Sequence, residues 1–501
     1  MIDSPATAAN GAAWSRRTLA IGVTAAILVV LGDLLFFPRE PGLNLAVFGI
    51  ALIVALLALN AERMADRAIQ VATALAIASL VPLVEAPTLT GFLWGLFGVS
   101  ILALALARLL PARFEDLPML LARFGTLAPF RLASDGLRLL GEAGSQNFGG
   151  RLGRGLLVWF VPAVFALVFV LLFVAANPLI ETALHAIRLE ALLDLLDPGR
   201  VILWGVIGLM VWPLLAPRLL TLWAGAVQGP VLPKAEGLIF GGVAIRNSLV
   251  LFNVIFLVQS AMDLVYLWGG VRLPEGLTYA AYAHRGAYPL IVTALLAAAF
   301  VLAAMRRGEA GEKSSLIRWL VYVWIGQNVL LVVSSILRLK FYVEEYALTE
   351  LRLAAGIWMA LVALGLVLIV ARIALRRSNG WLIAANLTTL GLTLYAVSIV
   401  DVRALIAWYD VTHSYELTGK GQRLDGYLMG DLGWTAMPAV DYFLAQSDGR
   451  PDASGDTHRS LRVMRQQQAE FVLQPVDWRS WSWRGERLRQ YVLASPYAPD
   501  P

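Results

Sequence analysis

The densest group of charged and polar side chains lies between two long apolar segments, over residues 338–352. Arginines, glutamates and tyrosines at such a place could handle a proton or a substrate at the outer mouth of a membrane domain. They could also form ion pairs that brace two helices, and we favour this brace because structural networks produce the same composition. The candidate residues are Arg338, Tyr342, Glu344, Glu345, Tyr346, Thr349 and Arg352.

The spacing within this cluster suggests a turn. On one continuous helix its members would form a single stripe. The chain must reverse here, so we expect a break in which Thr349 caps the next helix and Glu350 lies in its first turn. Arg338 and Arg352 would then lie near a glutamate of the 344–345 pair.

A second set of polar residues lies inside apolar segments: Asn253, Gln259, Asp263, Gln327 and Asn328. A carboxylate at membrane depth is a functional candidate, and Asp263 follows Gln259 by one helical turn, so both share a face. Together these residues could line a polar path. The alternative is hydrogen bonding between helices, at about 0.6 kcal/mol each. Asp33 is near a segment end and is expected to reach water.

The elements that position these residues follow from composition. Of 501 residues, 59% are hydrophobic and 15% are charged, whereas soluble proteins are nearer half and a quarter. The apolar residues occur in blocks of bilayer length without the alternation of barrel strands. The sequence therefore predicts an all-α, polytopic transmembrane helical bundle and excludes a soluble enzyme, a disordered chain and a nucleic-acid partner. About eleven spans are expected, at 18–37, 43–60, 68–84, 91–109, 155–176, 201–223, 247–268, 286–305, 316–337, 351–374 and 381–400.

Basic residues predict the orientation. With the N-terminus in the cytoplasm, inside segments hold 21 Lys and Arg and short outside loops hold 8, as the positive-inside rule requires. An odd number of spans then places the C-terminal region outside the cell membrane. The expected parts are a cytoplasmic tail (1–17), four spans (18–109), an Arg-rich amphipathic cytoplasmic segment (110–154), about seven spans (155–400) and a small, mostly helical extracytoplasmic region (401–501).

Two regions suggest partners besides the lipid bilayer. Anionic lipid would attract each arginine of residues 110–154 by about 1 kcal/mol, although a simple topology loop has the same composition. Near the C-terminus, Trp478, Trp481 and Trp483 alternate with arginines. These tryptophans suit either the lipid interface or packing against the membrane domain. The C-terminal region could also bind a protein partner.

Signals for cofactors and for catalysis are weak. The chain has no cysteine, and its four histidines lack ligand spacing, so we expect neither a metal site nor haem. There is no phosphate-binding loop and no nucleophile elbow. We expect no cofactor, and the sequence favours a protein that is not an enzyme.

Residues 346–359, Tyr-Ala-Leu-Thr-Glu-Leu-Arg-Leu-Ala-Ala-Gly-Ile-Trp-Met, resemble the Y-x-L-T-x-x-R-x-x-A-x-x-W-M signature of an uncharacterised family of bacterial multi-pass membrane proteins. Residues 279–290, 424–428 and 476–481 are more loosely similar, and Ala287 replaces the usual phenylalanine. The resemblance covers roughly 155–490, with little over the first four spans. It implies a bacterial inner-membrane protein and a domain of unknown function, and it supplies no mechanism.

Three functions fit these observations. The first is a non-enzymatic protein that assembles with, or signals to, a partner. The second is a transporter or permease in which Asp263 and its neighbours form the path and residues 338–352 form the gate. The third is a transferase for a lipid-linked substrate with Glu344 or Glu345 as base, which is the weakest because no acidic metal-binding pair accompanies them.

Overall fold

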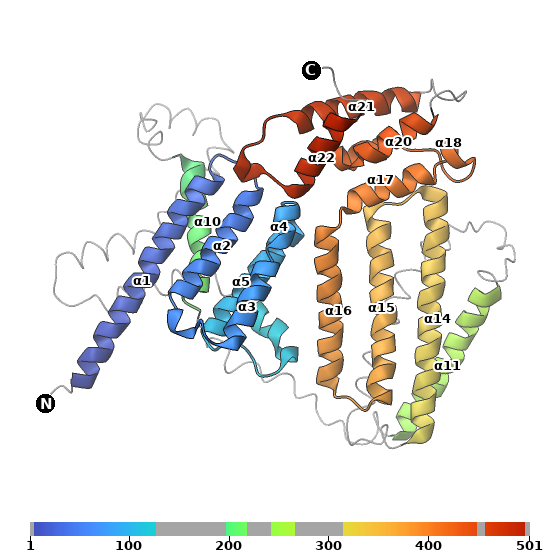
Figure 1. The fold of residues 1–501 in the computed structure, drawn as a ribbon. Helices are drawn as coiled ribbons and strands as arrows, with labels where there is room; N and C mark the ends of the chain where they lie inside the picture. The colour runs from blue at the N-terminus through green and yellow to red at the C-terminus, as the bar shows by residue number, and fades with distance from the viewer. Residues whose placement is uncertain (1–4, 127–196, 218–241, 266–313, 448–455, 496–501) are drawn as a thin grey trace, which may run out of the picture. The chain divides into compact units, whose positions relative to one another are not determined.

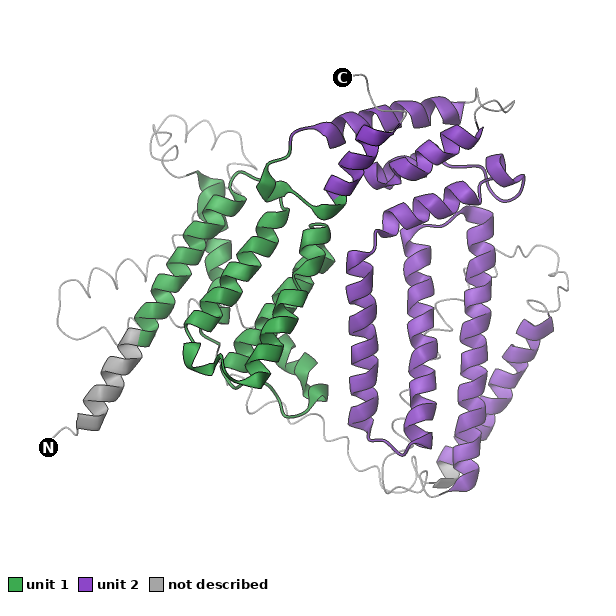
Figure 2. Cartoon of the chain, in the orientation of Figure 1, with its two compact units in different colours: residues 1–224, 476–484 green, residues 225–475, 485–501 purple. Residues whose placement is uncertain are grey.

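A computed structural model describes residues 5–126, 197–217, 242–265, 314–447 and 456–495 (Figure 1). These residues are helical, with no strand among them, and eight of their helical segments are long and apolar enough to cross a membrane. The chain is thus a helical, multi-pass membrane protein. It divides into two compact units, residues 1–224 with 476–484 and residues 225–475 with 485–501, which are described separately (Figure 2).

The first unit is a helical bundle whose turns are set by capping side chains. Asp66 accepts from the amide of Ala68, and Thr88 accepts from the amide of Gly91, which satisfies amide groups that a helix start leaves unpaired. Leu56, Ile69 and Leu102 are fully buried in its core. Its main helices are α1 (Pro5–Phe36), α2 (Leu43–Ala58), α3 (Arg67–Ala78), α4 (Val81–Glu85), α5 (Leu89–Leu106) and α10 (Pro198–Leu215).

Asp33 joins two helices of this unit and does not reach water, so the expectation for this residue is wrong. The residue is only 8% exposed. Its two carboxylate oxygens accept from Nε and Nη2 of Arg200, each at 2.7 Å, and Oδ1 also accepts from Trp204 Nε1 at 2.9 Å. The bidentate pair ties the end of α1 to the first turns of α10 and satisfies a charge that would be costly to bury alone.

Residues 476–484, the strap, belong to the first unit although they lie near the C-terminus. The amide of Leu43 donates to the Trp481 carbonyl at 2.8 Å, and Arg484 pairs with Glu85 at 3.3 Å. Arg479 also hydrogen-bonds Asp477 and lowers the pKa of that carboxyl to about 2. The structure therefore divides the predicted C-terminal region (401–501) between the two units.

Replacing Gly42 with alanine should release the strap, because a Cβ there would overlap the main chain of Ser480. Since the chain has no cysteine, Ser482→Cys offers a single labelling site, and Ser482 is only 9% exposed. We expect fast maleimide labelling with Gly42→Ala and slow labelling without it. Gly22→Ala is the control, because a Cβ there meets nothing within 4 Å. Equal labelling rates in all three proteins would show that the strap is not held by this contact.

The described residues of the second unit include four long helices that pack in chain order, with α14, α15 and α16 side by side (Figure 1). Their N-caps are serine or threonine where a cap is described, as at Ser314, Thr349 and Ser378. The shared core includes Val321, Trp324 and Met359. The helices are α11 (Gly242–Asp263), α14 (Ser315–Tyr346), α15 (Glu350–Ala374) and α16 (Asn379–Ile399).

Shorter helices follow α16 and form the cap, which we define as residues 402–447, 456–475 and 485–495. Phe443 and Leu461 are fully buried in it, and Arg465 forms a buried bidentate pair with Asp441 at 2.9 and 3.1 Å. The helices are α17 (Val402–Thr412), α18 (Tyr415–Thr418), α19 (Gly426–Asp431), α20 (Met437–Ser447), α21 (Asp456–Leu473) and α22 (Trp483–Ala494), with a short 3-10 turn at Gly433–Ala436. The first two residues of α22, and a second 3-10 turn at Trp478–Ser480, belong to the strap.

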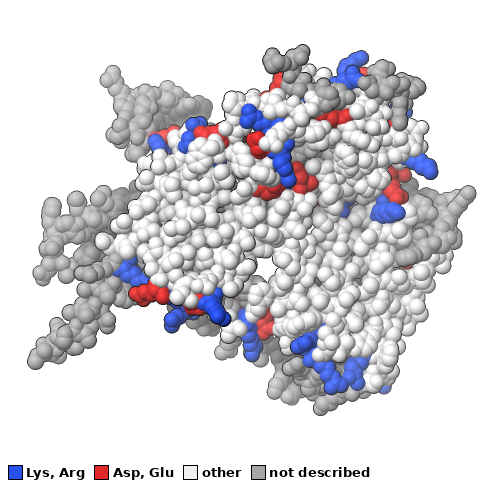
Figure 3. Space-filling model, in the orientation of Figure 1, with Lys and Arg blue, Asp and Glu red and all other residues white. Residues whose placement is uncertain are grey.

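The long helices lie where the sequence predicts spans, although several begin or end at other residues. α1 begins at Pro5, inside the expected tail, and α14 extends to Tyr346. The predicted third span is broken into α3 and α4. On the face in Figure 3, charged side chains of each unit gather near the ends of its long helices, with an uncharged band between, as a bilayer requires. The predicted spans 155–176 and 286–305, and residues 127–154 of the Arg-rich segment, lie outside the described residues.

Candidate functional site

Residues 346–352, the signature turn, connect α14 to α15. The α14 helix ends at Tyr346, and Ala347 has a φ of +66°, which reverses the chain. The Thr349 hydroxyl then accepts from the amide of Arg352 at 3.4 Å, and Glu350 lies in the first turn of α15. The expected cap and first turn are confirmed. Because a non-glycine residue with positive φ is strained, neighbouring contacts must hold this turn.

Arg352 holds the signature turn from inside. Its guanidinium donates to the carbonyl oxygens of Tyr346 and Ala347. It also lies 4.4 Å from the ring centroid of Tyr342 and 5.9 Å from that of Tyr346, which is cation–π distance. Arg352 thus donates hydrogen bonds to carbonyl groups that the end of α14 leaves without an amide partner.

The expected pairing of the arginines with the glutamates is wrong. Glu344 is exposed and pairs with Lys340 at 3.7 Å, and Glu345 is exposed. Arg338 forms a buried ion pair with Asp263 of α11 instead. The reason is that α14 remains helical through residue 346, which places Arg338 two turns before the signature turn and on the side that packs against α11.

The predicted polar path is a seam between α11 and α14. Gln259 donates to Asp263 at 3.1 Å, and Gln327 donates to the carbonyl of Asn253 at 3.2 Å. The Asn253 amide group donates across to the Leu320 carbonyl at 3.1 Å, while Asn328 bonds within its own helix. Polar side chains thus form hydrogen bonds between the two helices. Arg338, a member of the 338–352 cluster, pairs with Asp263 and so connects that cluster to the seam.

We expect Asp263→Asn to destabilise the protein by about 3–5 kcal/mol, because it leaves the Arg338 charge buried without its partner. The double variant Asp263→Asn/Arg338→Gln should recover most of the loss. Glu350→Gln is the control, since its pair with Arg403 at 2.7 Å is half-exposed and such pairs contribute about 1 kcal/mol or less. Thermal unfolding in lipid nanodiscs measures all three. An Asp263→Asn protein as stable as the wild type would contradict the brace.

Asp410 completes the site, and sequence reasoning missed it. It lies on α17 and is 6% exposed. Its Oδ1 accepts from the amide of Leu348, in the middle of the signature turn, at 2.7 Å, while Oδ2 has no hydrogen-bond partner among the described residues. A signal was available: Ile406, Ala407 and Val411 share the apolar face of α17 with this aspartate.

The ionisation of Asp410 is set by opposing effects. Burial raises its pKa to about 6, against the lowering effects of the Leu348 amide and of the Arg352 and His413 charges. Asp410 therefore titrates close to neutral pH. The titratable or charged groups nearby are Glu344 on α14, Arg352 on α15, Tyr409 and His413 on α17, and Lys420, Arg423 and Asp425 on the segment that follows.

A cavity of about 390 Å³, the cap cavity, opens beside Asp410. Its walls are the end of α14, the last turn of α17 and residues 418–429. Asp410 is the most buried charged group in its lining, whereas Lys420 and Arg423 are exposed at its edge. The His413 ring stacks on Tyr409 at 4.1 Å and contributes a flat wall. This volume is in the range of small-molecule sites.

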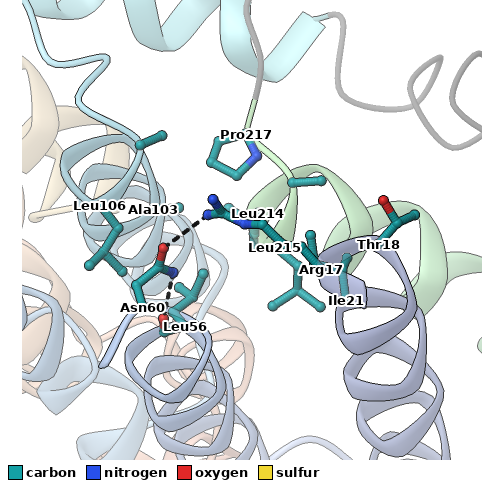
Figure 4. A pocket seen from close by; sticks show the side chains of 12 residues that line it. Arg17, Thr18, Ile21, Leu56, Asn60, Ala103, Leu106, Leu214, Leu215 and Pro217 are labelled. Carbon is teal, nitrogen blue, oxygen red and sulfur yellow. Dashed lines mark hydrogen bonds between the residues drawn. The ribbon is translucent and has the colours of Figure 1, made fainter. Parts of the chain in front are cut away.

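A second cavity, of about 440 Å³, lies in the first unit (Figure 4). Its only charged lining residue is Arg17, which donates to Asn60 at 3.3 Å. Asn60 in turn donates to the Leu56 carbonyl at 2.9 Å, and the other side chains are mostly apolar. No acidic side chain lines this second cavity. The cap cavity, with the buried Asp410, is therefore the stronger candidate for a functional site. Among the described residues, no group of three or more His, Cys, Asp or Glu could hold a metal ion.

The sequence profile of a family described as a domain of unknown function, DUF4153, matches residues 47–442. The chain belongs to this family. The match includes the signature turn, Asp410 and the cap cavity, so the site lies within the family's domain. It also begins in α2 and ends before residues 476–481, which corrects the expected limits of roughly 155–490. No curated protein and no solved structure matches the chain.

Replacing Arg352 with glutamine should destabilise the signature turn by about 1–3 kcal/mol, because carbonyl groups lose a charged donor. Glu345→Gln should change stability by less than about 0.5 kcal/mol, since Glu345 is exposed. The double variant should be additive in thermal unfolding, because the two side chains do not interact. If the double variant were as stable as the wild type, Arg352 and Glu345 would interact. That result would support the ion pair predicted from the sequence and contradict the structure.

Proposed function

We propose that the protein is a non-enzymatic signalling component of the bacterial inner membrane. In this proposal the cap lies on the extracytoplasmic side of the inner membrane and transmits the state of its cavity to the membrane-spanning helices. One observation supports it above the others: Asp410 lines the cap cavity, and one of its carboxylate oxygens holds the turn between two spans.

The physical link runs through the Leu348 amide. A hydrogen bond to an ionised carboxylate is roughly twice as strong as one to a neutral group. Protonation of Asp410, or a cation at its free oxygen, therefore weakens the hold on Leu348. The signature turn starts from a strained φ at Ala347, so a weaker hold changes how α14 and α15 are joined.

The location and the partner belong to the same proposal. The excess of basic residues in the predicted inside segments supports a cytoplasmic N-terminus and an extracytoplasmic cap. Trp408 and Tyr442 form an exposed aromatic pair at 5.0 Å on the cap, which supports docking of a protein partner that receives the signal. A truncation at about residue 405 would test this poorly, because it removes Ile406 and Val411 from the core that includes Leu348.

The Asp410 ionisation should make stability depend on pH. Its folded pKa, about 6, is above the ordinary value of 3.8, so its contribution is fully present below about pH 4 and is lost as pH rises through about 6. The wild type should lose a few degrees of thermal stability across this window, and hydrogen exchange at the Leu348 amide should change with the same midpoint.

Asp410→Asn should abolish both effects, because asparagine keeps an oxygen acceptor but does not titrate. Asp431→Asn is the matched control: Asp431 is exposed on α19 and should keep the wild-type profile. A pH-dependent Leu348 exchange that persists in Asp410→Asn would overturn the proposed link.

A further inference from the structure

The cap cavity presents opposite charges at two depths. Asp410 is the buried charged residue of the lining, and its Oδ2, which is itself buried, has no donor among the described residues. The exposed part of the lining carries the bases Lys420 and Arg423 as well as the acids Glu344 and Asp425. Neither base makes an ion pair with a described residue. A ligand that satisfies both ends must carry a positive donor and a negative acceptor.

The buried end favours a primary ammonium. A carboxylate removed from water is stabilised by a charged donor far more than by a neutral one. The exposed carboxylate of Glu344 lines the same cavity and adds negative charge. A divalent cation fits less well, because oxygen-ligated Ca²⁺ needs six or more ligands and no group of three or more described His, Cys, Asp or Glu side chains is placed to hold a metal ion.

The edge favours a phosphate. Arg423 presents a planar set of donors that matches phosphate oxygens, and Lys420, three residues away, adds a point charge. The aromatic wall of Tyr409 and His413 and the apolar side chains of Leu424 and Leu428 lie in the same lining. They suit the short carbon linker between the two charges of a small zwitterion.

The cavity also lies at a particular level of the fold. Val343 and Glu344, at the end of the membrane-spanning α14, form one wall, and α17 begins three residues after α16 ends. The site is therefore beside the ends of the spans, where lipid headgroups are found.

We infer that the cap cavity binds the phosphoethanolamine group, with its ammonium on Asp410 and its phosphate on Lys420 and Arg423. This inference names the ligand of the site on which the proposed function rests. The group occurs both in free phosphoethanolamine and in the headgroup of phosphatidylethanolamine, and the two sources can be separated by experiment.

The test uses the full chain in nanodiscs of phosphatidylcholine, with free phosphoethanolamine or free phosphocholine added, and in nanodiscs that also contain phosphatidylethanolamine. The readouts are thermal stability and hydrogen exchange over residues 418–429. Phosphocholine is the discriminating control, because its methylated ammonium cannot donate a hydrogen bond to Asp410. Protection by the free compound identifies a soluble ligand, and protection only by the lipid identifies a headgroup site.

Asp410→Asn should weaken the preference for the ethanolamine form by about tenfold, as loss of one charged hydrogen bond implies. Lys420→Gln with Arg423→Gln should weaken both forms, whereas Arg459→Gln, exposed on α21 and outside the cavity lining, should leave binding unchanged. Equal protection by the choline and ethanolamine forms, or by neither, overturns the inference. The pH-dependent exchange of Leu348 is measured without any added ligand, so it can hold when the ligand assignment fails.

Discussion

The Leu348 amide and the Asp410 carboxylate form the bond on which the second unit depends, because it joins the cap to the connection between two spans. Leu348 lies in a turn that Ala347 enters with a positive φ, and such a turn persists only when its surroundings hold it. Arg352 supports it from the α15 side and Asp410 from the cap. Burial also raises the pKa of Asp410 to about 6, and on the proposed function this makes the same bond sensitive to protons.

The bilayer imposes a second constraint, since a charge in an apolar segment must find a partner within the protein. The two units meet this requirement in the same way. Asp33 pairs with Arg200 between α1 and α10, and Asp263 pairs with Arg338 between α11 and α14. Each pair joins helices that the chain separates widely, so these residues specify which helices pack together and do not require a transport path to explain them.

Segment length and hydropathy predicted the long helices, and side-chain chemistry predicted the Thr349 cap, because both depend on neighbouring residues. The partners in the ion pairs were not predicted correctly. Arg338 had glutamates close by in sequence, but its partner is 75 residues away, and Asp33 has its partner 167 residues away. Asp410 was missed for the same reason, since its role comes from a turn 62 residues earlier. The strap is a further case, because nothing in residues 476–484 indicates which unit they join.

The most direct measurement is a titration of the Asp410 carboxyl by infrared spectroscopy, in which the spectrum of Asp410→Asn is subtracted from that of the wild type at each pH. Hydrogen exchange of the Leu348 amide is measured over the same pH range in the same nanodiscs. The account predicts a carboxyl that titrates near pH 6 and an amide whose exchange follows the same curve. A carboxyl that titrates near its ordinary pKa, or a Leu348 exchange rate that does not change across that titration, would contradict the account.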